Sequence, residues 1–359
     1  MALDPDLEAW LTLSFAPGLT HEAFRQLLVA FRGPQEILAA SRAELSRVVA
    51  DRAVRAVLAQ ASRELLDKTA AWLEDPANHV VTLGDTTYPQ ALLDVADPPP
   101  LFYAKGRVEL LNAPSFAIVG SRNATQQGIA HAESFGRALS DAGLTIVSGL
   151  ALGIDAAAHV GGLAGASSTI AVVGTGLDIV YPARNRDLAH DIAQRGCLLS
   201  EFPLGMAPVA ANFPLRNRLI SGLAQGCLVV EAAVSSGSLI TARLANEQGK
   251  DVFAMPGSVN SPLTKGCHNL IKDGAKLAET ADDILAELKL PSAARAAPRS
   301  KARDEEHAVL AHMGFDPCDF DTLAARTGLS AEALGALLTE WEIHGLIEAL
   351  PGGRYQRLR

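Results

Sequence analysis

The chain has 359 residues, of which 48% are hydrophobic and 20% are charged, and its formal net charge is −9. This length favours two or three compact units, and this composition excludes wholesale disorder. The excess of acid weakens the long-range attraction of nucleic acids, so a nucleic-acid site would have to be a locally positive groove.

The cysteine spacing and the hydropathy of the chain indicate in which cellular compartment the protein works. The cysteines form no CxxC pair, which argues against a zinc ribbon and a disulfide framework and fits a reducing cytosol. The first ten residues lack the basic and apolar regions of a secretory signal. No apolar run reaches the roughly 18 residues that a membrane span needs. We therefore expect a soluble, cytoplasmic protein with no metal site and no membrane partner.

Residues 1–75 are predicted to form an N-terminal helical domain. Apolar residues recur at helical spacing in 7–15, 21–31, 34–40 and 55–73. The turn Pro17-Gly18-Leu19 is similar to that of a SAM/helix-hairpin-helix-like unit, which can bind a phosphate through backbone N–H groups. A plain helical interaction module is the alternative.

Residues 76–290 are predicted to form an α/β core. A short strand at 79–83 and a triple proline at 98–100 precede a regular alternation of strands and helices. The near-continuous apolar runs suit parallel strands buried on both faces; they lie at 116–120, 144–148, 169–174, 197–201, 227–232 and 252–257. This alternation predicts an extended Rossmann-like, doubly wound parallel sheet.

Residues 291–303 are rich in proline, alanine and arginine and are predicted to be a flexible linker.

Residues 304–359 show three helical stretches and a hairpin with Pro351-Gly352-Gly353 at its tip, the pattern of a winged-helix domain. Its recognition segment, 330–343, contains Glu332, Glu340 and Glu342 but no lysine or arginine. Protein docking is therefore favoured over reading of a DNA groove, which stays an alternative.

Small and hydroxylated residues follow several of the predicted strands. In an open parallel sheet, ligands bind beyond the carboxyl ends of the strands, where backbone N–H groups can approach an anion. One such turn by itself need do no more than connect a strand to a helix. Three such turns on one edge of the sheet favour anion binding. The candidate residues are Gly120, Ser121, Arg122, Ser148, Gly149, Ser236, Gly237, Ser238 and Thr241.

A second positive element spans 213–222. Arg216, Asn217 and Arg218 stand where a helix is predicted to open, and cations there are unfavourable unless they meet an anion. Arg184 follows another strand in a similar way. These arginines either contact phosphate or form structural salt bridges with Asp187, Glu201 or Glu231. Phe213 or Phe202 could stack on a base, or they could be local core residues.

The catalytic motifs that we sought are absent from the sequence. The run GTGLDI (174–179) lacks the third glycine of a dinucleotide loop, and no GxxxxGK[ST], GxSxG, HExxH or zinc-deaminase pattern occurs. Asp155 and His159 could be an acid/base pair or a helix-stabilising pair. Glu231 could be a general base or could cap the next helix.

We therefore expect a protein with no catalytic residue and no cofactor that is not an enzyme. One alternative is a nucleotide-binding Rossmann-like enzyme, such as a nucleoside monophosphate hydrolase. The run SSGSLIT (235–241) disfavours it, because such enzymes carry a PGGxGT-type loop there. Another alternative is a scaffold whose flanking modules do the work while the core dimerises.

The ordered motifs resemble those of the bacterial DNA-processing DprA (Smf) family. These motifs run through nearly all of 88–285, and the flanking modules are also similar to those of the family. The motifs are AIVGSRNAT, SGLALGIDAAAH, GLDIVYPARN, LLSEFPLG, FPLRNRLISGL, VVEAAVSSGSLITARLANEQG and VFAMPGS. The resemblance implies a homodimer that binds single-stranded DNA, protects incoming strands in natural transformation and loads the RecA recombinase. It implies a phosphate-binding role for Arg122, a small-residue rim at Ser148-Gly149 and 236–238, and a pocket formed by 213–218.

Overall fold

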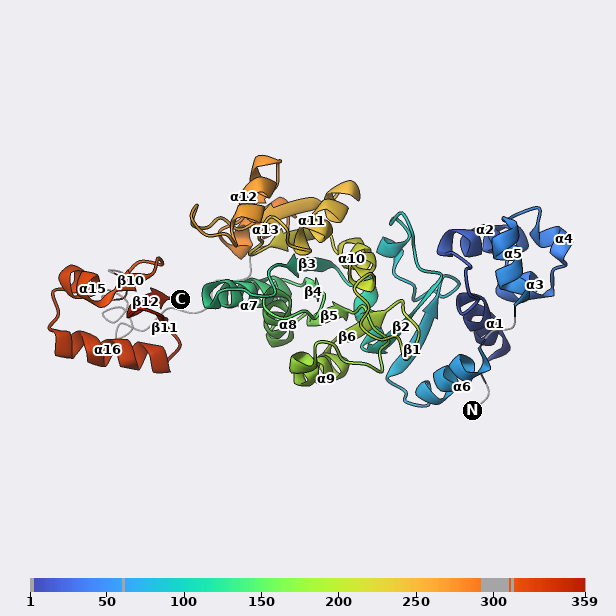
Figure 1. Cartoon of the computed structure of the whole chain (residues 1–359), viewed down its shortest axis with the longest axis horizontal. Coiled ribbons are helices and arrows are strands. Elements are labelled where there is room, and N and C mark those ends of the chain that lie inside the picture. The colour runs from blue at the N-terminus through green and yellow to red at the C-terminus, as the bar shows by residue number, and fades with distance from the viewer. Residues whose placement is uncertain (1–2, 60–61, 292–309, 311–312, 359) are drawn as a thin grey trace.

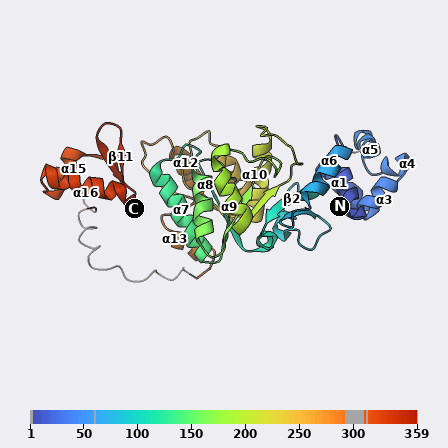
Figure 2. The same ribbon diagram turned by 90° about the horizontal axis from the view of Figure 1, so that it is seen from below.

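The computed structural model describes residues 3–59, 62–291, 310 and 313–358. Three parts follow one another along the long axis of the molecule: a helical module, an α/β core and a small C-terminal domain (Figure 1). Figure 2, seen from below, shows the same order, with the helical module and the C-terminal domain at opposite ends of the core.

The N-terminal module is helical, as predicted. Its elements are α1 (Pro5–Ser14), α2 (His21–Phe31), α3 (Pro34–Ala39), α4 (Arg42–Leu45), α5 (Asp51–Leu58) and α6 (Arg63–Trp72). The prediction of one helix over 55–73 was wrong, because Ala59 leaves the helical conformation with ψ 146°. Ser62 then starts a new helix, since its hydroxyl accepts a hydrogen bond from the Leu65 N–H.

The described core contains one mixed sheet with the order β1-β2-β6-β5-β4-β3-β7-β8-β9. The strands are β1 (Asn78–Thr82), β2 (Leu101–Gly106), β3 (Ser115–Val119), β4 (Thr145–Ser148), β5 (Thr169–Val172), β6 (Cys197–Ser200), β7 (Gly226–Val229), β8 (Asp251–Ala254) and β9 (Lys276–Leu277). Strands β3 to β9 pair in parallel, whereas β1 and β2 extend the edge antiparallel. The sequence had not predicted β2 or β9.

Helices cover both faces of the sheet, because alternate residues of each strand face opposite sides. Ala117 and Val119 pack with α10 (Asn212–Leu223), α11 (Ser238–Glu247) and α12 (Lys265–Lys272). Phe116 and Ile118 pack with α7 (Gln126–Asp141), α8 (Ile154–Ala164) and α13 (Ala281–Glu287). The helix α9 (Arg186–Arg195) shares a hydrophobic cluster with the N-terminal module. The doubly wound prediction is therefore confirmed.

The strand order creates a switch point at β3. The chain runs outward from β3 through β4, β5 and β6, then returns to the other side of β3 as β7. The loops that follow β3 and β7 therefore diverge at the carboxyl edge, where open α/β sheets form a ligand crevice.

The C-terminal domain has the predicted winged-helix pattern in its described part. It comprises β10 (Cys318–Asp319), α15 (Phe320–Thr327), α16 (Ala331–Ile343), β11 (Ile347–Leu350) and β12 (Arg354–Arg357). Most of the predicted linker and of the first tail helix lies outside the described residues. Gln356 donates to the Gln127 side chain of α7 at 2.9 Å, so β12 lies beside the start of α7. Among the described helices, none is long and apolar enough to cross a membrane.

Candidate nucleic-acid interface

A cavity of about 660 Å³ lies at the switch point of the sheet. It is lined by the loops after β3 and β7 and by the first turns of α10 and α11. The structure thus brings together most of the predicted site residues, namely Gly120, Ser121, Arg122, Phe213, Arg216, Asn217, Ser236, Gly237, Ser238 and Thr241.

Three helices begin at this cavity. The N-cap residues of α8, α10 and α11 are Gly153, Ala211 and Gly237, and none of the three caps its helix with its own side chain. The Ser236 hydroxyl accepts the Ser238 N–H of α11 at 3.4 Å, and the Ser121 carbonyl accepts the Ile154 N–H of α8 at 3.1 Å. The first N–H groups of a helix lack partners within it and carry a partial positive charge. The partial positive charge of these helix starts therefore favours an anion in the cavity.

Two arginines add full positive charge. Arg122 is exposed, and its guanidinium carbon lies 5.7 Å from the centroid of the Phe213 ring. Arg216 is 4% exposed and donates from Nη1 to the Val172 carbonyl at 2.6 Å, while its Nε has no partner among the described residues. Burial lowers the pKa of Arg216 to about 10, so it stays charged at neutral pH.

Gly149 makes room for the buried guanidinium. A Cβ at this position would lie 1.9 Å from Nη1 of Arg216. The turn around Gly149 is held by the Asp155 carboxylate, which accepts the Gly149 N–H at 3.2 Å. It is also held by Asn185, whose side chain donates to the carbonyls of Leu150 and Ala151. Sequence reasoning missed Asn185, although it follows directly on the predicted candidate Arg184.

An aromatic pair borders the cavity. The ring centroids of Phe213 and Tyr181 are 5.7 Å apart, and both residues line the cavity. Tyr181 is 45% exposed and offers a face to a planar ligand. The sequence pattern pointed to Phe202 and not to Tyr181. In the described structure, the cavity lining includes Tyr181 and omits Phe202.

Four predicted residues lie outside the cavity lining. Ser148 is buried and donates its hydroxyl to the Ile118 carbonyl at 2.6 Å, and Gly149 lies behind Arg216. Arg184 is exposed on the short 3₁₀ helix Ala183–Asn185. Arg218 pairs with Glu201 instead.

The position of Arg218 follows from the face of α10 on which it lies. Arg216 and Arg218 are both inside this helix, which spans Asn212–Leu223. Residues two apart on an α-helix point about 200° apart, so they cannot enter the same cavity. For Arg218, the structure corrects the phosphate interpretation in favour of the salt bridge to Glu201.

Glu231 caps a helix. Its carboxylate accepts the Thr125 N–H at 3.0 Å and the Thr125 hydroxyl at 2.6 Å, and Thr125 is the N-cap of α7. Burial raises the pKa of Glu231. Glu231 therefore holds the start of α7, which follows β3, and not that of α11, the next helix along the chain, which the capping alternative predicted. These contacts occupy both carboxylate oxygens.

His159 and Asp155 do not pair with each other in the described structure, so both sequence interpretations of this pair were wrong. His159 Nε2 accepts the Leu150 N–H at 3.2 Å, and Nδ1 lies 2.7 Å from the Thr169 hydroxyl. Burial lowers the pKa of His159 to about 3, so the imidazole is neutral. Across the described residues, no group of histidine, cysteine, aspartate and glutamate side chains could hold a metal ion.

The sequence matches two family models. Residues 79–289 match a model described as DNA recombination-mediator protein A, and residues 291–353 match the DprA winged helix domain. Protein Smf of Escherichia coli strain K12 is 40% identical over 307 residues, which cover 83% of this chain and 82% of that protein. DNA processing protein DprA of Streptococcus pneumoniae is 47% identical over 205 residues, which cover 57% and 72%.

Comparison with solved structures also gives DprA proteins. DprA from Streptococcus pneumoniae aligns with a TM-score of 0.68 and 36% identity over 80% of this chain and 99% of that one. DNA processing protein A from Helicobacter pylori, whose structure concerns a single-stranded DNA binding mode, aligns with a TM-score of 0.53 and 32% identity over 59% and 96%. These matches show that the chain belongs to the DprA (Smf) family of DNA-processing proteins.

Proposed function

We propose that this chain binds single-stranded DNA in the cavity at the switch point. The observation that carries the proposal is the convergence of Arg122, Arg216 and the Phe213–Tyr181 pair on one cavity at which three helices begin. Cations and helix N-termini suit phosphates, and the rings suit unstacked bases. The related protein from Helicobacter pylori has a described single-stranded DNA binding mode, which supports this choice of anion.

A single strand fits these features better than a duplex does. Bases in a duplex are already stacked on each other and cannot offer their faces to Phe213 or Tyr181. On α16 the exposed Glu332, Glu340 and Glu342 would repel a DNA backbone. The same acidic surface supports docking of a protein on the winged-helix domain.

The chain acts by binding and not by catalysis in this proposal. The support is the position of Glu231, which holds the start of α7. Free-base release from nucleoside monophosphates tests the point directly. Turnover that Glu231→Gln abolishes would instead establish the hydrolase.

The cellular role that we propose is that of a cytoplasmic recombination mediator in natural transformation, which works as a homodimer, protects incoming strands and loads RecA. The family model described as DNA recombination-mediator protein A supports mediation. The resemblance of the sequence motifs to the family supports the dimer and RecA as partner. Analytical ultracentrifugation tests the dimer. RecA filament growth on strands coated with single-strand-binding protein tests loading, and growth unchanged by this protein would contradict it.

Arg122→Ala is expected to weaken binding of all single-stranded sequences about equally, by roughly 10- to 100-fold, because charge-assisted bonds to phosphate contribute about 1.5–3 kcal/mol. The plot of log affinity against log salt concentration should flatten by about 0.7, since one phosphate fewer is neutralised. Fluorescence anisotropy with labelled oligonucleotides at several salt concentrations measures both quantities. Arg122→Lys should retain the salt slope but lose part of the affinity, because lysine lacks the planar fork.

The matched control is Arg137→Ala, which removes a second exposed arginine that lies on α7, away from the loop of Arg122. Its side chain is 67% exposed and contacts Asp141 at 3.8 Å. This variant should bind like the unchanged protein. Tight binding by Arg122→Ala at physiological salt, or equal losses in both variants, would contradict the role of Arg122.

A further inference from the structure

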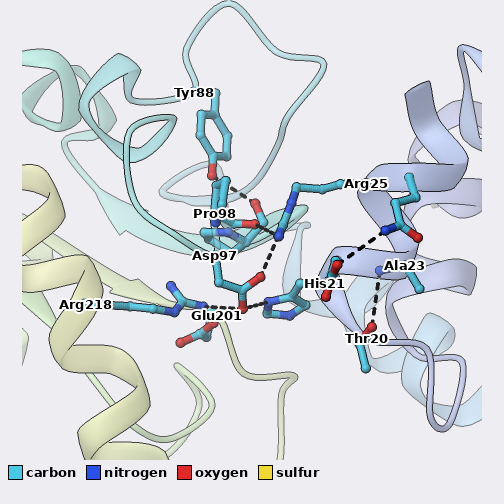
Figure 3. Close-up of polar contacts among 12 residues, drawn as sticks. Thr20, His21, Ala23, Arg25, Tyr88, Asp97, Pro98, Glu201 and Arg218 are labelled. Carbon is cyan, nitrogen blue, oxygen red and sulfur yellow. Dashed lines mark hydrogen bonds and ion pairs between the residues drawn. The ribbon is translucent and has the colours of Figure 1, made fainter. Parts of the chain in front are cut away.

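Five charged or titratable side chains meet between the N-terminal module and the core, and we call them the interdomain cluster. They are His21 and Arg25 of α2, Asp97 in the loop before β2, Glu201 after β6 and Arg218 of α10 (Figure 3). Asp97 accepts from Arg25 Nη1 at 2.6 Å, and its other oxygen lies 3.3 Å from His21 Nδ1 and 3.9 Å from Arg218 Nη2. Arg218 Nη2 also contacts Glu201. The cluster therefore links α2 to α10 through Asp97.

Charge balance makes Asp97 necessary to the cluster. The Arg218 and Glu201 side chains are 13% and 4% exposed, and within the described chain Arg218 Nη1 and Glu201 Oε1 have no partner. The hydrogen bonds from His21 and Arg25 hold the pKa of Asp97 well below its usual range, so it is ionised. Without that charge, Arg25 would lose its ion-pair partner, and Glu201 alone would balance the charge of Arg218.

The loop that carries Asp97 packs directly on α10. A Cβ at Gly222 of α10 would lie 2.5 Å from Val95 and 2.9 Å from Leu92. Arg25 also donates to the Pro98 carbonyl at 2.7 Å, and Tyr88 donates to the Pro99 carbonyl at 2.9 Å (Figure 3). Because the loop is held from both sides, α10 cannot turn or slide without disturbing it.

The same helix presents its other side to the cavity. Phe213 and Arg216 line the cavity, whereas Arg218 faces the interdomain cluster. We propose that His21, Arg25 and Asp97 are positioning residues that set the orientation of α10, so that docking of the N-terminal module increases the affinity of the cavity for single-stranded DNA. The affinity part of this inference rests on the proposed function, and the orientation part does not.

Asp97→Asn in the full chain tests both parts. Asparagine keeps the shape of aspartate and removes its charge, so Arg25 and Arg218 lose their shared counter-ion. Amide hydrogen exchange, followed by mass spectrometry, should become faster in residues 212–223 and 21–31. The dissociation constant for an oligonucleotide should rise about 5- to 20-fold, a typical size for coupling between sites. A second pair of variants separates charge from packing: Arg25→Lys should retain most of the affinity and Arg25→Met should not.

The matched control is Lys68→Ala. Lys68 of the module pairs with Asp178 of the core at 2.7 Å, so this variant also breaks an ion pair between the module and the core, but one that does not contact α10. Exchange in 212–223 and DNA affinity should stay unchanged in it. Thermal unfolding must show that each variant is folded at the assay temperature.

The outcomes separate this inference from the proposed function. If the unchanged protein does not bind single-stranded DNA, the proposed function fails, and amide exchange in 212–223 still tests the orientation of α10. If Asp97→Asn leaves that exchange unchanged, the inference is overturned whatever the affinity. If amide exchange in 212–223 becomes faster in Asp97→Asn while this variant binds the oligonucleotide with unchanged affinity, the proposed coupling between the interdomain cluster and the cavity is overturned. An affinity loss in Lys68→Ala equal to that in Asp97→Asn would also overturn it.

Discussion

Arg218→Met is expected to lower the free energy of unfolding by about 3–5 kcal/mol, because it leaves the Glu201 carboxylate buried without its ion-pair partner. The Glu201 side chain is 4% exposed, so water cannot replace the lost contact. Urea denaturation followed by circular dichroism at pH 7 measures the loss. A free energy of unfolding within about 1 kcal/mol of the unchanged protein would contradict the assignment.

The matched control removes both charges. The double variant Arg218→Met with Glu201→Met should recover most of the stability, since replacing a buried ion pair by apolar residues is often neutral. Burial already raises the pKa of Glu201 in the folded protein, and losing Arg218 would raise it further. An acid whose pKa is higher folded than unfolded contributes stability at low pH that is lost as pH rises through the folded pKa. The stability deficit of the single variant should therefore shrink as the pH is lowered from 7 towards about 4.3, the usual pKa of glutamate.

Gly149→Ala is expected to cost about 1–3 kcal/mol of stability and at least about tenfold in affinity for single-stranded DNA. The new Cβ would lie 1.9 Å from Nη1 and 2.3 Å from Nη2 of Arg216. The guanidinium must move, which breaks its bond to the Val172 carbonyl and withdraws its charge from the cavity. Chemical denaturation and fluorescence anisotropy on the same preparation measure both losses.

Gly237→Ala is the control for the stability measurement. Gly237 belongs to the same cavity and has φ −63° and ψ −19°, which alanine adopts without strain. In the described structure, nothing lies within 4 Å of the position that its Cβ would take. Its free energy of unfolding should stay within about 0.5 kcal/mol of the unchanged protein. If Gly149→Ala behaved in the same way, the proposed steric role of Gly149 would be wrong.

Much of the fold could be predicted because its signals are local. Buried parallel strands have near-continuous apolar runs, as in β3 and β7, and the turn at 351–353 marks the hairpin of the winged-helix domain. The strand β2 is antiparallel and follows a triple proline, so the strand–helix rhythm did not reveal it. The break between α5 and α6 depends on the Ser62 cap inside a continuous helical pattern.

The sequence by itself determined which edge of the sheet would carry the site, because small residues, hydroxyls and Arg122 follow the strands that end there. Only the tertiary structure decided which side chains meet. Tyr181 approaches Phe213 from a different loop, Gly149 makes room for Arg216 of α10, and Arg218 turns to Glu201. The physical reason is that local sequence sets the periodicity and the caps of single elements. The partner of a side chain depends instead on strand order and on the direction in which each helix face points, and both are fixed by packing across the whole core.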